Sequence, residues 1–157
     1  EKLKFKLELY ATMWDRPPHA EIMLNDVSHF KGHITGTEDK PDLIEFEHEL
    51  DEGKEYKLTI NRSGSDKTQT VVNEKGDLLK DQLLHIKGIE IDEIDLGALV
   101  YEGLYTPDYP EPWATQQREA GVELRDSFKN VTCIGHNGTW QFKFTSPFYM
   151  WLLENLY

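Results

Sequence analysis

Apolar and polar residues alternate with period two along much of this chain. The pattern is clear in residues 3–9 and again in residues 44–50, where glutamates fill most of the polar positions. Successive side chains of a strand point to opposite faces of a sheet, so the alternation predicts strands with one buried face. It resumes in residues 56–60, after a turn-like segment that contains Gly53. We therefore predict an antiparallel hairpin over residues 43–61.

Three further segments have strand character. Residues 68–72 are rich in β-branched side chains and precede a turn-like segment, which predicts a second hairpin. Residues 84–96 form an apolar run whose phase slips near Asp92, and the slip indicates a bulge or a strand break. Aromatic residues alternate over 140–144, after a hairpin-turn signal at residues 136–138.

These segments together predict an all-β fold. Two segments, 78–84 and 149–156, have partial helical character, but each is too short to form an independent helix. Strands separated by frequent turn signals are typical of a two-sheet antiparallel β-sandwich, here with jelly-roll-like topology and at most short helices. The length of 157 residues fits a single domain over residues 1–157. We expect five aromatic residues near the C-terminus to lie in its core: Trp140, Phe142, Phe144, Phe148 and Trp151.

The composition and charge of the chain narrow the classes of partner that we expect it to bind. The chain has 17 basic and 29 acidic residues and a formal charge of −12, whereas nucleic-acid affinity depends largely on clustered Lys and Arg. We therefore expect no nucleic-acid partner. No stretch approaches the roughly 20 apolar residues of a membrane span, which predicts no membrane insertion. The single cysteine, Cys133, excludes an internal disulfide and is expected to be a buried structural residue.

The exception to the regular pattern is a long aromatic and proline-rich loop at residues 101–121. It carries Tyr105, Tyr109 and Trp113, and Trp14 lies in a second proline-bounded segment between the first two predicted strands. Tyrosine and tryptophan offer a flat apolar face beside a polar group, so exposed rings on a stiff backbone could stack on sugar rings or on a partner's side chains. We predict these four residues as ligand-binding. The alternative is that the rings fold back and cap the core.

Carboxylates form the second candidate site. Calcium takes six to eight oxygen ligands, and Asp77, Asp81, Asp92 and Asp95 could supply some of them. The EF-hand spacing is absent, and the alternative is a solvated strand face. The histidines lack zinc-protease spacing and the chain has no nucleophile elbow, which favours a non-catalytic protein. An enzyme would need a concave pocket with paired titratable groups.

Several strand and turn segments resemble those of known proteins. They are residues 32–34, 56–62, 70–72, 76–82 and 89–94, together with 137–140 and 147–154. The chain resembles small β-sandwich proteins encoded by tailed bacteriophages, especially those of marine cyanobacteria, and more distantly calcium-dependent carbohydrate-binding modules. The resemblance implies a virion surface or accessory part that binds something. In the carbohydrate-binding modules, loop carboxylates hold calcium that grips sugar hydroxyls.

Two functional hypotheses follow. The first is a non-catalytic binding module, a phage virion or accessory protein, that recognises glycan through its loop aromatics, with Ca²⁺ as its candidate cofactor. The second is a structural or assembly protein whose aromatic C-terminal segment, residues 148–157, packs against another protein subunit.

Overall fold

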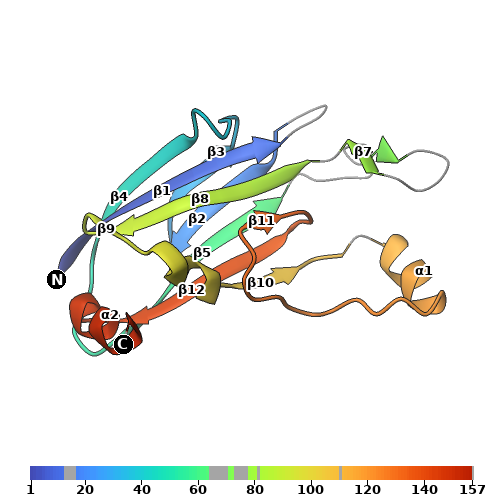
Figure 1. Ribbon diagram of the computed structural model, residues 1–157. Coiled ribbons are helices and arrows are strands. Elements are labelled where there is room, and N and C mark those ends of the chain that lie inside the picture. Colours follow the sequence, from blue (N-terminus) through green and yellow to red (C-terminus); the bar gives the residue numbers. More distant parts are fainter. Residues whose placement is uncertain (13–16, 64–70, 73–77, 81, 110, 157) are drawn as a thin grey trace.

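A computed structural model describes residues 1–12, 17–63, 71–72, 78–80, 82–109 and 111–156. In this part of the chain, two antiparallel sheets of five strands each lie face to face (Figure 1). The first sheet has the order β11, β8, β1, β4, with β9 paired to β8; the second has the order β10, β12, β5, β2, β3. The arrangement confirms the predicted all-β, two-sheet sandwich.

The bounds of the elements are as follows. The first sheet contains β1 (Lys2–Thr12), β4 (Asp42–Glu49), β8 (Leu83–Ile91), β9 (Ile94–Asp95) and β11 (Cys133–Ile134). The second contains β2 (His19–Leu24), β3 (Val27–His33), β5 (Glu55–Ser63), β10 (Leu104–Pro107) and β12 (Gly138–Thr145). A separate two-stranded ribbon contains β6 (Val71–Val72) and β7 (Leu78–Lys80). The helices are the 3₁₀ helix η1 (Gly97–Glu102), α1 (Trp113–Glu119) and α2 (Phe148–Leu156).

The core lies between the two sheets. The first sheet contributes the inward residues of β1, all of them buried, and the second contributes Trp140, Phe142 and Phe144 of β12. The rings of Phe5 and Phe144 approach to 6.2 Å between centroids and so join the two layers. Phe148 of α2 is also buried, against Phe144. The predicted core placement is confirmed for Trp140, Phe142, Phe144 and Phe148, whereas Trp151 is half-exposed and packs against the core from outside.

The outer face of the first sheet carries matched charges. In the register of β1 and β4, Lys2, Lys4 and Lys6 lie directly opposite Glu49, Glu47 and Glu45. Opposite charges across neighbouring strands stabilise the pairing, by about 0.2–1 kcal/mol per pair. These side chains are exposed or half-exposed, so the predicted solvated face is confirmed for the three glutamates.

The predicted hairpin over residues 43–61 is wrong. Both strands exist, but β4 pairs with β1 in the first sheet whereas β5 pairs with β12 and β2 in the second. The connection crosses between the sheets because its backbone groups bond elsewhere: the Leu50 N–H donates to the Glu1 carbonyl (2.6 Å) and the Gly53 N–H to the Ser146 carbonyl (2.8 Å). The turn signal at residues 136–138 likewise joins the two sheets, since β11 pairs with β8 and β12 pairs with β10 and β5.

The remaining predictions of secondary structure are confirmed in part. The strand break near Asp92 is confirmed as a tight turn between β8 and β9, with positive φ at Asp92 and Glu93. The hairpin beginning in 68–72 is confirmed for the pairing of β6 with β7, and residues 68–70 lie outside the described part. Residues 149–156 are helical within α2, but the helix considered for 78–84 is wrong, because β7 and the start of β8 occupy it.

Two corrections concern the long loop and the cysteine. The segment 101–121 is not one irregular loop, because it contains the end of η1, the strand β10 and the helix α1. Cys133 is exposed instead of buried. Ile134 takes the inward position of the short strand β11, so the neighbouring side chain must point outward.

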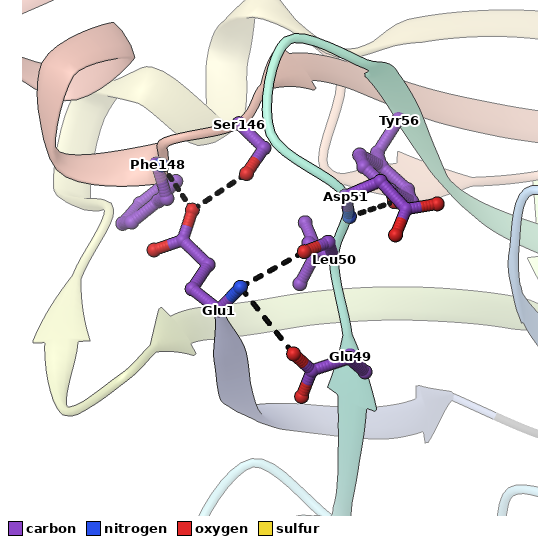
Figure 2. A network of polar contacts seen from close by, with 7 residues as sticks. All are labelled: Glu1, Glu49, Leu50, Asp51, Tyr56, Ser146 and Phe148. Carbon is purple, nitrogen blue, oxygen red and sulfur yellow. Dashed lines mark hydrogen bonds and ion pairs between the residues drawn. The ribbon is translucent and has the colours of Figure 1, made fainter.

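The N-terminus of α2 is anchored by a residue far away in sequence (Figure 2). The Glu1 carboxylate accepts hydrogen bonds from the Ser146 hydroxyl (2.7 Å) and from the backbone N–H of Phe148 (2.8 Å). A carboxylate at this position satisfies a free helical N–H and interacts favourably with the helix dipole. The contact fixes α2 against the strands that flank it.

A buried arginine joins the sheets at the opposite end. Arg62 of β5 is only 2% exposed, and its guanidinium donates to the carbonyl of Ile134 (2.9 Å) and to the backbone and side-chain oxygens of Gln82 (2.6 and 2.8 Å). Gln82 and Ile134 belong to the segments that begin β8 and form β11. Since hydrogen bonds from a charged donor are the stronger ones, Arg62 ties the second sheet to the first.

The packing around Trp140 predicts a strict requirement for glycine at position 103. A Cβ atom added there would lie 2.3 Å from the Trp140 ring, which is fully buried and cannot move aside. Gly103→Ala should lower the free energy of unfolding by about 1–3 kcal/mol or more, measured by urea denaturation.

Gly88→Ala is the matched control. A Cβ at Gly88 meets nothing within 4 Å, so this variant should stay within about 1 kcal/mol of the wild type. Equal stabilities of the two variants would contradict the close approach of Gly103 to Trp140.

Candidate ligand-binding site

Three aromatic side chains gather beyond the end of β10. The ring centroids of Tyr109 and His136 are 5.3 Å apart, those of Trp113 and His136 5.6 Å, and those of Tyr109 and Trp113 6.1 Å. All three side chains are half-exposed. We call these three residues the aromatic cluster. Tyr109 follows β10, Trp113 begins α1, and His136 lies in the connection from β11 to β12.

Tyr105 supports the aromatic cluster from the interior. It is 5% exposed, and its hydroxyl donates to the His136 carbonyl (2.8 Å) and accepts from the His136 backbone N–H (3.1 Å). Burial raises the pKa of Tyr105 to about 12, so the hydroxyl keeps its proton at neutral pH. Tyr105 therefore fixes the backbone that carries the His136 ring and does not offer a face of its own to solvent.

Further hydrogen bonds hold the Tyr109 ring and the start of α1, which carries Trp113. The Tyr109 hydroxyl donates to the Arg125 carbonyl (2.7 Å), and the Asp108 N–H donates to the Asn137 carbonyl (2.6 Å). The Glu111 carboxylate accepts from the Thr115 hydroxyl (2.6 Å) in the first turn of α1. These contacts are all made within the chain itself, and side chains that are already held in place lower the ordering cost of binding.

The three rings form an angled surface. The ring planes of Tyr109 and Trp113 are inclined by 37°, those of Trp113 and His136 by 36°, and those of Tyr109 and His136 by 69°. Such a surface can contact a ligand from more than one side. Its polar groups, one imidazole and one indole N–H, can add hydrogen bonds to a ligand that carries hydroxyls.

The structure thus brings together two of the four predicted aromatic residues, Tyr109 and Trp113. Tyr105 lies beneath them, and Trp14 is outside the described residues. His136 belongs to the cluster but was interpreted from sequence only as part of a turn. Its position depends on the bond between its backbone and Tyr105, which no local pattern shows.

The structure describes two of the four predicted calcium ligands, Asp92 and Asp95. Asp92 accepts a hydrogen bond from the Tyr149 hydroxyl, and Asp95 accepts one from the Gly97 N–H (2.8 Å). Asp77 and Asp81 lie outside the described residues. Across the ranges that the structure does describe, no three side chains of His, Cys, Asp or Glu are grouped so that they could hold a metal ion. Calcium binding stays a prediction.

A pair of histidines lies between the edge strands of the two sheets. His29 Nε2 of β3 and His48 Nδ1 of β4 are 3.0 Å apart, a hydrogen-bond distance. The His29 ring stacks on Phe46 (4.1 Å), which in turn stacks on Phe5 (4.9 Å). Burial and then the nearby His48 lower the pKa of His29. The pair joins two strands that have no backbone pairing with each other.

Comparison of the chain with protein-family models, with curated proteins and with solved structures finds no match. Within the described residues, no helix has the length and apolar character needed to cross a membrane. The fold and the site therefore define the class from geometry: a two-sheet β-sandwich with an angled, half-exposed aromatic cluster at one end.

The histidine pair predicts acid sensitivity. Because the pKa of His29 is lower in the folded state than its usual 6.5, the unfolded chain takes up the proton first as pH falls. The stability present above pH 6.5 should be lost progressively below it. Urea unfolding at about pH 7.5 and about pH 5.5 should show this loss in the wild type and a smaller loss in His29→Phe.

His33→Phe serves as the control, because His33 is exposed on the same strand. It should keep the wild-type difference between the two pH values. An unchanged difference in His29→Phe would show that His29 does not cause the acid sensitivity.

Proposed function

We propose that this protein is a non-catalytic binding module that recognises glycan through the aromatic cluster. The observation that carries the proposal is that Tyr109, Trp113 and His136 remain half-exposed although each is held in place: Tyr109 by a hydrogen bond of its hydroxyl, His136 by hydrogen bonds of its backbone, and Trp113 by its place in the first turn of α1 beside the other two rings. Large aromatic rings ordinarily lie in the core, and the core of this sandwich is already filled by other rings. A held, solvent-facing group of rings is typical of a binding surface.

Sugar ligands suit this surface because each ring of a glycan has an apolar face and a rim of hydroxyls. Stacking contributes on the order of 1 kcal/mol per aromatic ring beyond area burial, so one site should bind weakly. Display in many copies would raise the avidity. The resemblance to phage-encoded sandwiches supports a place on a virion, where such display occurs.

The test removes one ring at a time. A glycan array with the wild-type chain identifies a binding oligosaccharide, and calorimetric titration then measures its affinity. Trp113→Ala and Tyr109→Ala should each weaken binding about fivefold, the equivalent of about 1 kcal/mol. Tyr101→Ala, at an exposed tyrosine in η1, is the control and should bind as the wild type does.

A melting curve of each variant confirms that it is folded. If folded Trp113→Ala and Tyr109→Ala bind the oligosaccharide as tightly as the wild type, the assignment of the site to the aromatic cluster is wrong.

A second candidate function is assembly through α2. Tyr149, Met150 and Leu153 are 44%, 57% and 59% exposed, while Phe148 and Leu152 on the same helix are buried. Contiguous exposed apolar side chains are typical of surfaces that bind another protein. On this proposal the outward side of α2 packs against a second copy of this protein.

Sedimentation velocity tests the second candidate. The wild type should show an oligomer that forms with increasing concentration, and the double variant Met150→Lys with Leu153→Lys should sediment as a monomer. Lysine makes the net charge of −12 less negative, so general repulsion between copies cannot explain the loss. A wild-type monomer at every concentration would exclude self-assembly through α2.

A further inference from the structure

A hollow lies beside α2. Figure 1 shows α2 at one end of the sandwich and α1 at the other. The volume of the hollow is about 530 Å³, and its lining comes from η1, β10, β12, α2 and Lys129. We call it the η1–α2 groove. This volume falls in the range of about 300–1,000 Å³ that is typical of small-molecule sites.

The apolar part of the groove is rigid. Trp151 of α2 is half-exposed and stacks on Phe148 at 6.0 Å, and its ring meets the edge of Phe142 at 5.4 Å. Leu104 of β10 completes this side. The indole is therefore held by the core on one side and lines the groove with the rest of its surface.

The polar rim carries an unusual charge. Lys129 and Lys143 line the groove together with a single acid, Glu102, although the whole chain has a formal charge of −12. Within the described part of the chain, neither lysine forms an ion pair. The Gln141 side chain adds an amide to the same rim.

The pairing of Lys143 makes a purely structural role for this charge unfavourable. In the register of β12 and β5 it lies directly opposite Lys57. Like charges opposite each other destabilise a sheet, whereas the first sheet places a glutamate opposite each lysine in residues 2–6 of β1. The second sheet thus keeps Lys143 beside the groove, where the rim has two lysines and one acid and so carries a net positive charge.

We propose that the η1–α2 groove binds a small organic anion, whose carboxylate pairs with Lys129 and Lys143 and whose ring lies against Trp151. The charge of the rim is complementary to a carboxylate, and the apolar side is complementary to a flat ring. The carboxylate can come from an acidic sugar or from an aromatic acid. This site is separate from the aromatic cluster and does not depend on the glycan proposal.

The experiment is an NMR titration of the full 157-residue chain at constant ionic strength with four probes: glucuronate, benzoate, glucose and inorganic sulfate. Glucuronate, benzoate or both should shift the Trp151 indole N–H and the Gln141 side-chain amide in a saturable way. Glucose and sulfate should not, because each lacks one half of the recognised chemistry. The acid that binds identifies the source of the carboxylate.

Substitutions then test whether the two lysines contribute to binding of the acid. Lys129→Gln and Lys143→Gln should each weaken binding of that acid about two- to fivefold, and the affinity of the wild type should fall with added salt. Lys31→Gln, at an exposed lysine on the far edge strand β3, is the matched control and should bind normally. Lys143→Gln should melt no lower than the wild type, because it removes the opposition to Lys57.

The proposal is overturned by the absence of a saturable shift with either acid, by sulfate binding equal to that of the acids, or by unchanged affinity in both lysine variants. Trp113→Ala separates the two sites. It should leave the binding of the acid unchanged, and a loss of binding in this variant would place the acid in the aromatic cluster and overturn the groove assignment.

Discussion

The row of aromatic rings along β12 is the constraint on which the rest of the structure depends. Trp140, Phe142 and Phe144 alternate on the inner face of a strand that is paired on both sides, so they cannot leave the interior without disrupting the second sheet. Phe144 contacts Phe5 of the first sheet and Phe148 of α2. The same side chains therefore pack the two sheets together and hold α2 against them. The groove beside Trp151 exists because this row ends under α2.

The existence of most strands could be predicted from sequence, but the pairing of β4 and β5 could not. A tight turn with a glycine at positive φ serves both a hairpin within one sheet and a connection between two, so the turn at Gly53 does not distinguish them. Charge does. A hairpin closed at residues 51–55 would place one lysine, Lys57, opposite the glutamates of β4, whereas pairing with β1 places a lysine opposite each of the three. The pairing is decided by contacts between side chains of neighbouring strands, and the pattern within a single strand does not show these contacts.

The candidate site was predictable to the same partial degree. Tyr109 and Trp113 were identified because aromatic residues between prolines are conspicuous in sequence, but the strand phase of β10 that buries Tyr105 is only four residues long. His136 joins the cluster through hydrogen bonds between its backbone and the Tyr105 hydroxyl, which is 31 residues away in sequence. Cys133 is exposed because a two-residue strand assigns its single inward position to Ile134. Short elements leave too few positions for periodicity to be read, and contacts between distant segments leave no local trace.

The connections that cross between the sheets also govern how the chain can fold during synthesis. The central pairings join distant segments: Leu7 lies beside Ile89, and Leu58 lies beside Phe142. Closing such long loops costs entropy before any contact compensates for it, which slows folding. Because β12 emerges from the ribosome after the other strands that the structure describes, β5 and β10 each have an unpaired edge until their shared neighbour is made. The nascent chain is thus exposed to aggregation until β12 arrives, and a chaperone that covers these edges would act on this interval.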